Sequence, residues 1–246
     1  MPVWIQDLEK VLNDENAVIA KALLTHRHLD HVLGVSDLRK LSPVTKYYKN
    51  SPDEGQDGIQ DGDVFRVEGA TLTALHTPGH TSDHMCFIFE EEDAIFTGDN
   101  VLGHGTSVFE DLGAYMSSLQ KMLDQRIKGV AYPGHGAVIE DAEKRINEYI
   151  LHRKQREDQI LEVLADSLRR SKGGNGSLTV MDIVDMVYPS IGPDLRQAAA
   201  KGVVQVLKKL EAEGRVGKEE REGQERWFLR AHPSFEIKIL RSSPVL

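Results

Sequence analysis

The stretch LTHRHLDHVLG, which starts at Leu24, gathers three histidines and an aspartate within a few positions, directly after an apolar run. These side chains are His26, His28, Asp30 and His31. The whole chain of 246 residues has only 10 histidines, so the clustering is not a matter of composition. Titratable groups held together without a partner repel one another or lose their solvation. Imidazole nitrogens and carboxylate oxygens are ligands of zinc and similar divalent ions, so the stretch predicts a metal site.

Three later segments place further metal-ligating side chains after strand-like runs. LTALHTPGH ends on His80, AIFTGDN contains Asp99, and GVAYPGHG contains His135. Loops at the ends of strands can bring such side chains to one point while the strands hold them in place. A glycine beside each of them lets the backbone turn sharply. The four segments together offer five histidines and two aspartates, which is enough for two ions.

Composition narrows the class of protein. Hydrophobic residues make up 40% of the chain and charged residues 28%, as in globular proteins. No apolar run is long enough to cross a bilayer, and the N-terminus shows no signal core. Cys86 is the only cysteine, which excludes an internal disulfide and fits a reducing compartment. We therefore expect a cytoplasmic protein with no membrane association.

The apolar pattern predicts alternating helices and strands up to the glycine-rich stretch SKGGNGS. A helix is expected in VWIQDLEKVL, a buried strand in AVIAKALLTH, three strands between Leu72 and Asp99, and a helix in LGAYMSSLQKML. A short strand in GVAYP and a long helix from DAEKR onward follow. After SKGGNGS, two helices and a hairpin predict a small winged-helix module. We expect a main domain over residues 1–170, a linker over 171–176, and the winged-helix-like domain and tail over 177–246.

The motif HRHLDH, followed in order by HTPGHT, FTGDN and YPGHG, resembles the signature of the metallo-β-lactamase superfamily of hydrolases. The resemblance spans Leu24 to about Arg156. It implies an α/β fold, namely the αββα sandwich of that superfamily, followed here by the winged-helix-like module. Family members carry strands ahead of their first helix, whereas only 25 residues precede His26. We therefore expect the N-terminal strands of the sandwich to be truncated.

The resemblance also implies a role for each of the seven side chains and a cofactor of two zinc ions. One ion would be bound by His26, His28 and His80. The second would be bound by Asp30, His31 and His135, and Asp99 would bridge the two. Zinc in such sites lowers the pKa of bound water to about 7 and so supplies hydroxide at neutral pH. Asp30 is the expected catalytic residue, which orients the attacking water and takes its proton.

A closer resemblance, in GDNVLGHGTSVFEDLGAYMSSL and in YPGHGAVIEDAEKRINEYILHRKQREDQIL, points to one branch of the superfamily. That branch contains the β-lactamase-like protein 2 group, which are endoribonucleases acting on single-stranded RNA. It also contains fungal thioesterases that release aromatic polyketides from the acyl carrier protein of a non-reducing polyketide synthase. The resemblance therefore implies either reaction, carried out by the same metal site.

We favour the two-zinc thioesterase of secondary metabolite biosynthesis, with an acyl carrier protein as its partner. RNA binding needs a basic groove or stacking aromatic side chains, whereas this chain has a net charge of −9 and is 6% aromatic. A metal-dependent endoribonuclease acting on single-stranded RNA is the alternative. A catalytically inactive scaffold is a third possibility, which the complete set of seven ligands disfavours.

Three further side chains near these motifs allow a structural interpretation. Cys86 lies in an apolar strand and is expected to be a buried thiol. His84 is expected to support a metal loop rather than to bind an ion. His104, in LGHGTSVFEDL, fits either a substrate contact or a role in shaping its loop. The winged-helix-like module carries nine acidic and nine basic residues between Ser177 and Arg230, so we do not expect it to read DNA.

Overall fold

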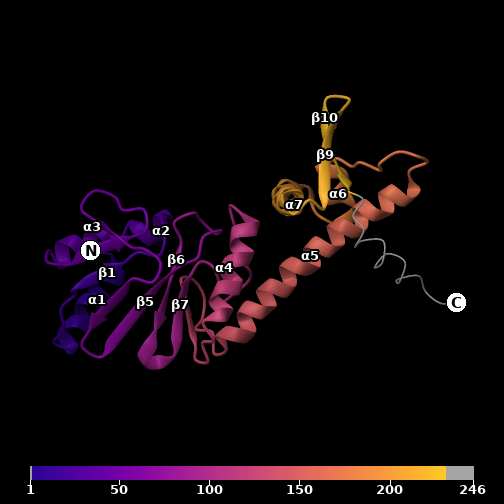
Figure 1. Ribbon diagram of the computed structural model, residues 1–246. Helices are drawn as coiled ribbons and strands as arrows, with labels where there is room; N and C mark the ends of the chain where they lie inside the picture. The colour runs from indigo at the N-terminus through magenta and orange to yellow at the C-terminus, as the bar shows by residue number, and fades with distance from the viewer. Residues whose placement is uncertain (1, 231–246) are drawn as a thin grey trace. The chain divides into compact units, whose positions relative to one another are not determined.

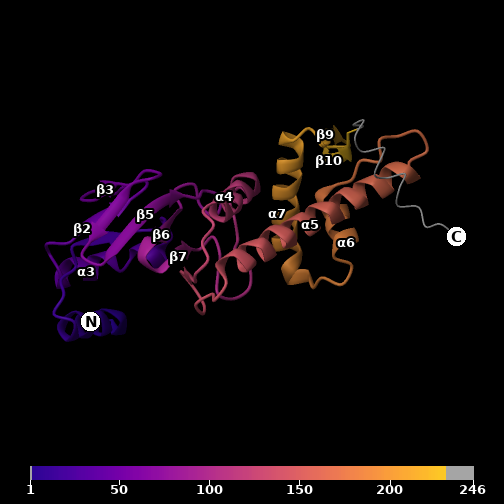
Figure 2. The same ribbon diagram turned by 60° about the horizontal axis from the view of Figure 1, so that its bottom comes forward.

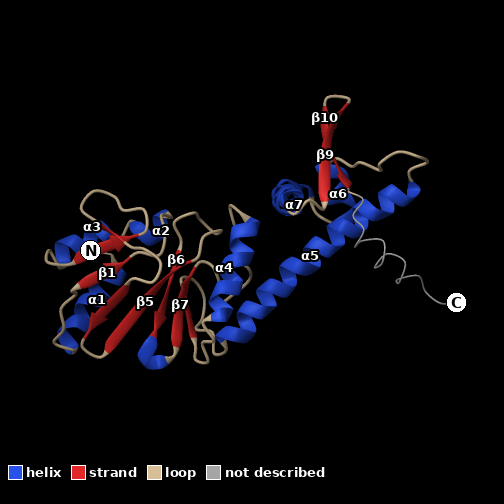
Figure 3. Cartoon of the chain, viewed as in Figure 1, coloured by secondary structure: helices blue, strands red, loops and turns tan. Residues whose placement is uncertain are grey.

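The computed structural model describes residues 2–230. These residues form two compact units, with the boundary between Ile150 and Leu151. Figure 3 shows helices and strands in both units. The long helix α5 (Ala142–Arg170) runs through the division, and the expected domain bounds stay a prediction. Residues 231–246 of the expected tail lie outside the described residues. Within residues 2–230, every helix is too short or too polar to pass through a bilayer.

A parallel three-stranded sheet opens the first unit. It consists of β1 (Lys21–Leu23), β2 (Lys46–Lys49) and β3 (Asp57–Gly58), in that order. The helices α1 (Val3–Asp14), α2 (Leu29–Val32) and α3 (Val35–Leu41) belong to the same part of the chain. The buried strand expected in AVIAKALLTH is only three residues long and half-buried. The reason is its place at the edge of the sheet, where it pairs with β2 on one side only.

A five-stranded sheet forms the other layer of the unit (Figure 1). Its strands, in spatial order, are β4 (Val64–Val67), β5 (Ala70–His76), β6 (Met85–Phe89), β7 (Ala94–Gly98) and β8 (Ala131–Pro133). A single 3-10 turn, η1 (Glu90–Glu92), connects β6 to β7. Strands β4 to β7 alternate in direction, whereas β8 is parallel to β7. As a result β5, β7 and β8 all end at the same edge of the sheet.

One cluster of the unit's hydrophobic core lies between the two sheets. Its buried members are Ile59, Ala74, Met85 and Phe87, and the side chains packed on them are Leu23, Tyr48, Phe65, Leu72 and Phe96. Both sheets contribute, and burying each large apolar side chain stabilises the fold by about 1.5–3 kcal/mol. The backbone N–H of Met85 also donates to the carbonyl oxygen of Thr25 at 2.7 Å. This bond joins the start of β6 to the residue that precedes the first histidine.

Helix α4 (Leu112–Asp124) anchors two loops at that edge of the sheet. It begins where the side chain of Asp111 accepts a hydrogen bond from the backbone N–H of Ala114, which caps the first turn. Its buried Tyr115 donates through the hydroxyl to the carbonyl oxygen of Asn100. Ser118 donates to the carbonyl oxygen of Pro78 at 2.6 Å. The helix thereby holds the loops that follow β5 and β7.

The second unit contains the two helices and the hairpin that the sequence predicts. Helix α6 (Val180–Val187) begins with a capping box between Thr179 and Asp182, and α7 (Pro193–Ala212) begins with a proline in its first turn. Strands β9 (Val216–Arg221) and β10 (Gln224–Leu229) form an antiparallel hairpin that contacts α7 (Figure 2). Trp227 of β10 is fully buried, and its backbone pairs with that of Leu178, just before α6. This arrangement confirms the predicted winged-helix module.

Candidate metal centre

All seven side chains predicted as ligands lie at one edge of the two sheets. His26 and His28 follow β1, His80 follows β5, Asp99 follows β7 and His135 follows β8. The remaining two, Asp30 and His31, lie on the short helix α2. The side chains form two groups, and within each group one ligand atom per residue lies within 4.8 Å of all the others. The strand ends therefore bring together residues that are more than 100 positions apart in the sequence.

The first group consists of His26, His28, His80 and Asp99. Nδ1 of His28 lies 3.0 Å from Nε2 of His26 and 3.0 Å from Nε2 of His80. Nδ1 of His80 donates to the carbonyl oxygen of Val108 at 2.8 Å, which leaves the lone pair on its Nε2. Both His26 and His80 are buried, so this group is shielded from solvent.

The second group consists of Asp30, His31 and His135, and it is more open. Nε2 of His135 lies 3.2 Å from Nε2 of His31 and 3.1 Å from Oδ2 of Asp30. The side chain of His135 is 42% exposed and that of Asp30 is 58% exposed. A substrate can therefore reach the site from the side of the second group.

Asp99 lies between the two groups. Its Oδ2 is 3.6 Å from Nε2 of His80 in the first group and 3.5 Å from Nε2 of His135 in the second. Its Oδ1 is 3.2 Å from Nε2 of His31, yet this oxygen is buried and accepts no hydrogen bond. A buried carboxylate oxygen without a hydrogen-bond partner is costly unless a cation compensates it.

The surroundings shift the pKa values of His26, Asp99 and His31 and thereby set their charges. Burial, together with the neighbouring His31 and His80, lowers the pKa of His26 to about 3. Burial alone would raise the pKa of Asp99, but the close His31 and the nearby His135 and His26 outweigh it and lower the pKa to about 2. The contact with Asp99 raises the pKa of His31. At neutral pH the first group thus presents a neutral imidazole and an ionised carboxylate, which are the forms that bind metals.

These observations fit a pair of metal ions. Ring nitrogens that converge on one another cannot all be satisfied by N–H donation among themselves, because a neutral imidazole carries one donor and one acceptor. A bound cation would satisfy the lone pairs of these rings and would compensate the buried Oδ1 of Asp99. Five imidazoles and two carboxylates form a donor set that suits zinc.

His84 supports the ligands through hydrogen bonds rather than as a ligand itself, as the sequence suggested. The backbone N–H of Asp99 donates to Nε2 of His84 at 3.0 Å, so Nδ1 of this buried ring carries the proton and donates to Oγ1 of Thr77 at 3.0 Å. Gly98 has a positive φ of 49°, and a Cβ there would lie 2.7 Å from Nε2 of His84. A Cβ on Gly134 would lie 2.5 Å from Oδ1 of Asp99. Glycine is required at both positions because the backbone passes so close to the site.

Cys86 is buried in β6 and belongs to neither group of ligands. Burial raises the pKa of its thiol to about 12, and the hydroxyl of Thr77 donates to its sulfur at 3.2 Å. Because the thiolate is the reactive form, we expect no reaction of native protein with a thiol-specific chromogenic disulfide at pH 8. One equivalent should react after unfolding in guanidinium chloride. Rapid labelling of the native protein would contradict this assignment.

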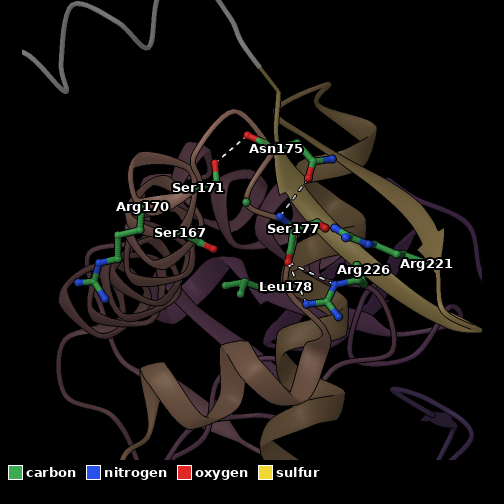
Figure 4. A pocket seen from close by; sticks show the side chains of 10 residues that line it. Ser167, Arg170, Ser171, Asn175, Ser177, Leu178, Arg221 and Arg226 are labelled. Carbon is green, nitrogen blue, oxygen red and sulfur yellow. Dashed lines mark hydrogen bonds between the residues drawn. The ribbon is translucent and has the colours of Figure 1, made fainter.

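A separate hollow of about 380 Å³ lies in the second unit (Figure 4). Its lining includes Arg170, Arg221 and Arg226, and the guanidinium of Arg226 donates to the carbonyl oxygen of Ser177 at 3.2 Å. The ten lining residues include no histidine, cysteine, aspartate or glutamate, so this hollow offers no ligands for zinc.

The sequence did not predict two contributors to the metal centre. The carbonyl oxygen of Val108 fixes the tautomer of His80, and Arg27 connects the loops around the site by its guanidinium. Because every residue has a backbone carbonyl, the sequence cannot show which one contacts a ligand. The one signal for Arg27 is its place between His26 and His28.

Comparison with known proteins agrees with this geometry. Residues 5–135 match the model of the metallo-beta-lactamase superfamily, and residues 179–227 match that of the beta-lactamase associated winged helix domain. The chain belongs to the metallo-β-lactamase superfamily and carries a C-terminal winged-helix domain.

Two curated relatives and one solved structure illustrate the similarity. The lactamase-like protein aptB of Emericella nidulans is 48% identical over 235 residues, which cover 94% of this chain and 76% of the relative. The atrochrysone carboxyl ACP thioesterase of Aspergillus chevalieri is 48% identical over 232 residues, which cover 93% and 75%. A beta-lactamase domain protein from Burkholderia ambifaria shares the fold with a TM-score of 0.75 at 15% identity, covering 93% of this chain and 80% of that one.

Proposed function

We propose that the protein is a two-zinc thioesterase that releases a polyketide from an acyl carrier protein. The observation that carries the proposal is the convergence of seven histidine and aspartate side chains into two groups with Asp99 between them. Membership of the metallo-β-lactamase superfamily supports hydrolysis as the reaction. The substrate class rests on relatives named atrochrysone carboxyl ACP thioesterases, at 48% identity for that of Aspergillus chevalieri. The proposed partner is accordingly an acyl carrier protein.

The residues of the site have different roles in hydrolysis. Zinc ions held by the seven side chains would polarise the thioester carbonyl and make a nearby water more acidic. Oδ2 of Asp30 takes a proton from the attacking water as the new C–O bond forms. The same carboxyl then returns the proton to the departing sulfur as the C–S bond breaks. Asp30 lies beside His135 in the second group, with Oδ2 of Asp30 3.1 Å from Nε2 of His135.

Apolar side chains next to the ligands support an apolar acyl group. Leu29, between His28 and Asp30, is 67% exposed, and Val108, whose carbonyl orients His80, is 72% exposed. Large apolar side chains that remain exposed beside a polar site commonly contact a ligand. We therefore expect the acyl chain to pack on Leu29 and Val108 while its carbonyl lies at the ligands.

Replacing Val108 by serine is expected to raise KM for an aromatic acyl carrier protein thioester by about tenfold, because the substrate loses apolar contact area. The zinc content and kcat should not change, since the backbone carbonyl that binds His80 remains. Val44→Ser is the matched control, because Val44 is equally exposed but lies just before β2, at the opposite end of the parallel strands. An unchanged KM for Val108→Ser would remove this residue from the acyl-binding surface.

The sharpest test of the proposal compares two substrates on one zinc-loaded preparation. An aromatic acyl carrier protein thioester should be hydrolysed, and the rate should fall to background in Asp30→Ala. Single-stranded RNA is the second substrate, because the alternative reaction would use the same ligands. RNA cleavage that disappears in Asp30→Ala, without thioester hydrolysis above background, would favour the endoribonuclease over the thioesterase.

A further inference from the structure

Arg27 lies between two of the proposed ligands, and its guanidinium reaches two other loops. Nη2 donates to both carboxylate oxygens of Glu110, at 2.6 and 2.8 Å. Nη1 donates to Oδ1 of Asp83 at 3.2 Å and to the hydroxyl of Ser82 at 3.2 Å. One side chain thus connects the histidine loop after β1, the loop after His80 and the loop that follows Asp99.

The contact with Asp83 balances a buried charge. Asp83 is 2% exposed, its Oδ1 also accepts from the hydroxyl of Thr81 at 2.7 Å, and its Oδ2 is buried without a hydrogen-bond partner. A buried carboxylate is tolerated when a cation pairs with it. Arg27 supplies that cation, so the loop that carries His80 depends on Arg27 for its charge balance.

The contact with Glu110 holds the loop that orients His80. Backbone N–H groups of Glu110 and Asp111 donate to the carbonyl oxygen of Gly79, at 2.7 and 3.1 Å. Two residues earlier, the carbonyl oxygen of Val108 accepts from Nδ1 of His80. A shift of Glu110 would therefore move the acceptor that keeps the lone pair of His80 on Nε2. The two N–H···O bonds that Nη2 of Arg27 donates to the two carboxylate oxygens of Glu110 restrict such a shift more than a single bond does.

We propose that Arg27 is a positioning residue that locks the loops around the first group of ligands and thereby sets its affinity for metal. It binds no ion itself. The inference rests on the proposed metal site but not on the thioesterase reaction. Groups that orient metal ligands commonly change metal affinity by about 10- to 100-fold when they are removed.

The test measures zinc affinity and thermal stability, with Zn²⁺ alone as the probe. Chelator competition should show that Arg27→Met weakens zinc binding by about 10- to 100-fold. The Tm of the metal-free variant should also fall, on the order of 10 °C, because Asp83 stays buried without its cation. Arg39→Met is the matched control, since Arg39 is exposed in the same unit and donates to the backbone of Glu54 and Gly55, away from the site. Its zinc affinity should equal that of the wild type.

Two further variants separate positioning from charge balance. The double variant Arg27→Met/Asp83→Asn removes the unpaired buried charge, so the Tm of the metal-free protein should recover while zinc binding stays weak. Arg27→Lys keeps a cation near Asp83, but its single nitrogen cannot bond Asp83 and Glu110 together as Nη1 and Nη2 of Arg27 do, so it should keep its Tm and lose part of the zinc affinity.

Two results would overturn the inference alone. One is zinc affinity within twofold of the wild type in Arg27→Met. The other is recovery of both Tm and zinc affinity in the double variant, which would assign Arg27 to charge balance only. Wild-type protein that binds no zinc would overturn the metal site together with this inference. Failure to hydrolyse a thioester would leave the inference standing, because none of its measurements uses turnover.

Discussion

Asp99→Ala is expected to reduce the metal content from two ions per chain to less than one. Its carboxylate lies 3.6 Å from His80 in the first group and 3.5 Å from His135 in the second, so both groups lose a ligand together. The negative charge that balances the cations near five imidazoles is lost as well. Elemental analysis of protein purified from zinc-supplemented medium, after gel filtration to remove loose metal, measures the effect.

Two single-group variants serve as comparisons for Asp99→Ala. His26→Ala should remove the ion of the buried first group, and His135→Ala should weaken the ion of the open second group. Each variant should retain about one ion. A metal content of two in Asp99→Ala would show that this residue does not bridge. The absence of zinc, iron and manganese from every wild-type preparation would contradict the proposed metal site.

The seven proposed ligands could be picked from the sequence because each follows a strand or begins a short helix. The ends of β5, β7 and β8 meet at one edge of the sheet, and this parallel relationship places His80, Asp99 and His135 together. Short runs of apolar residues locate the strand ends, and the ligand types then stand out beside them. What each side chain binds stays a prediction.

Other features depended on tertiary structure that the local pattern does not encode. The sequence placed one buried strand before the histidines, whereas the structure has a three-residue edge strand in a parallel sheet with β2 and β3. Pairing with strands later in the chain decides this burial. The contacts of Arg27 with Asp83 and Glu110 span 56 and 83 positions and depend on loop conformation. The pattern of apolar residues along the sequence does not predict contacts of this kind.

Asp30→Asn is expected to lower kcat by about 10²- to 10⁴-fold, the usual cost of losing a general base. Asparagine keeps an oxygen that can bind metal but cannot accept the proton of the attacking water. The metal content should therefore stay within a factor of two of the wild type, whereas Asp30→Ala should lose turnover and part of the second ion. Single-turnover hydrolysis of an aromatic acyl carrier protein thioester, with parallel elemental analysis, measures both.

Asp124→Asn is the control for the loss of a carboxylate in the same unit, because Asp124 is exposed at the end of α4 and accepts from the side chain of Gln120, away from the ligands. It should hydrolyse the thioester at the wild-type rate.

The exposure of Asp30, with 58% of its side chain accessible, lets the carboxylate meet the substrate and water at the open second group. Near wild-type turnover in Asp30→Asn would mean that Asp30 only binds metal and that another group accepts the proton. His104 would then be the next residue to test, because the loop that carries it is bonded through Gly103 to the carbonyl oxygen of His135 at 2.9 Å.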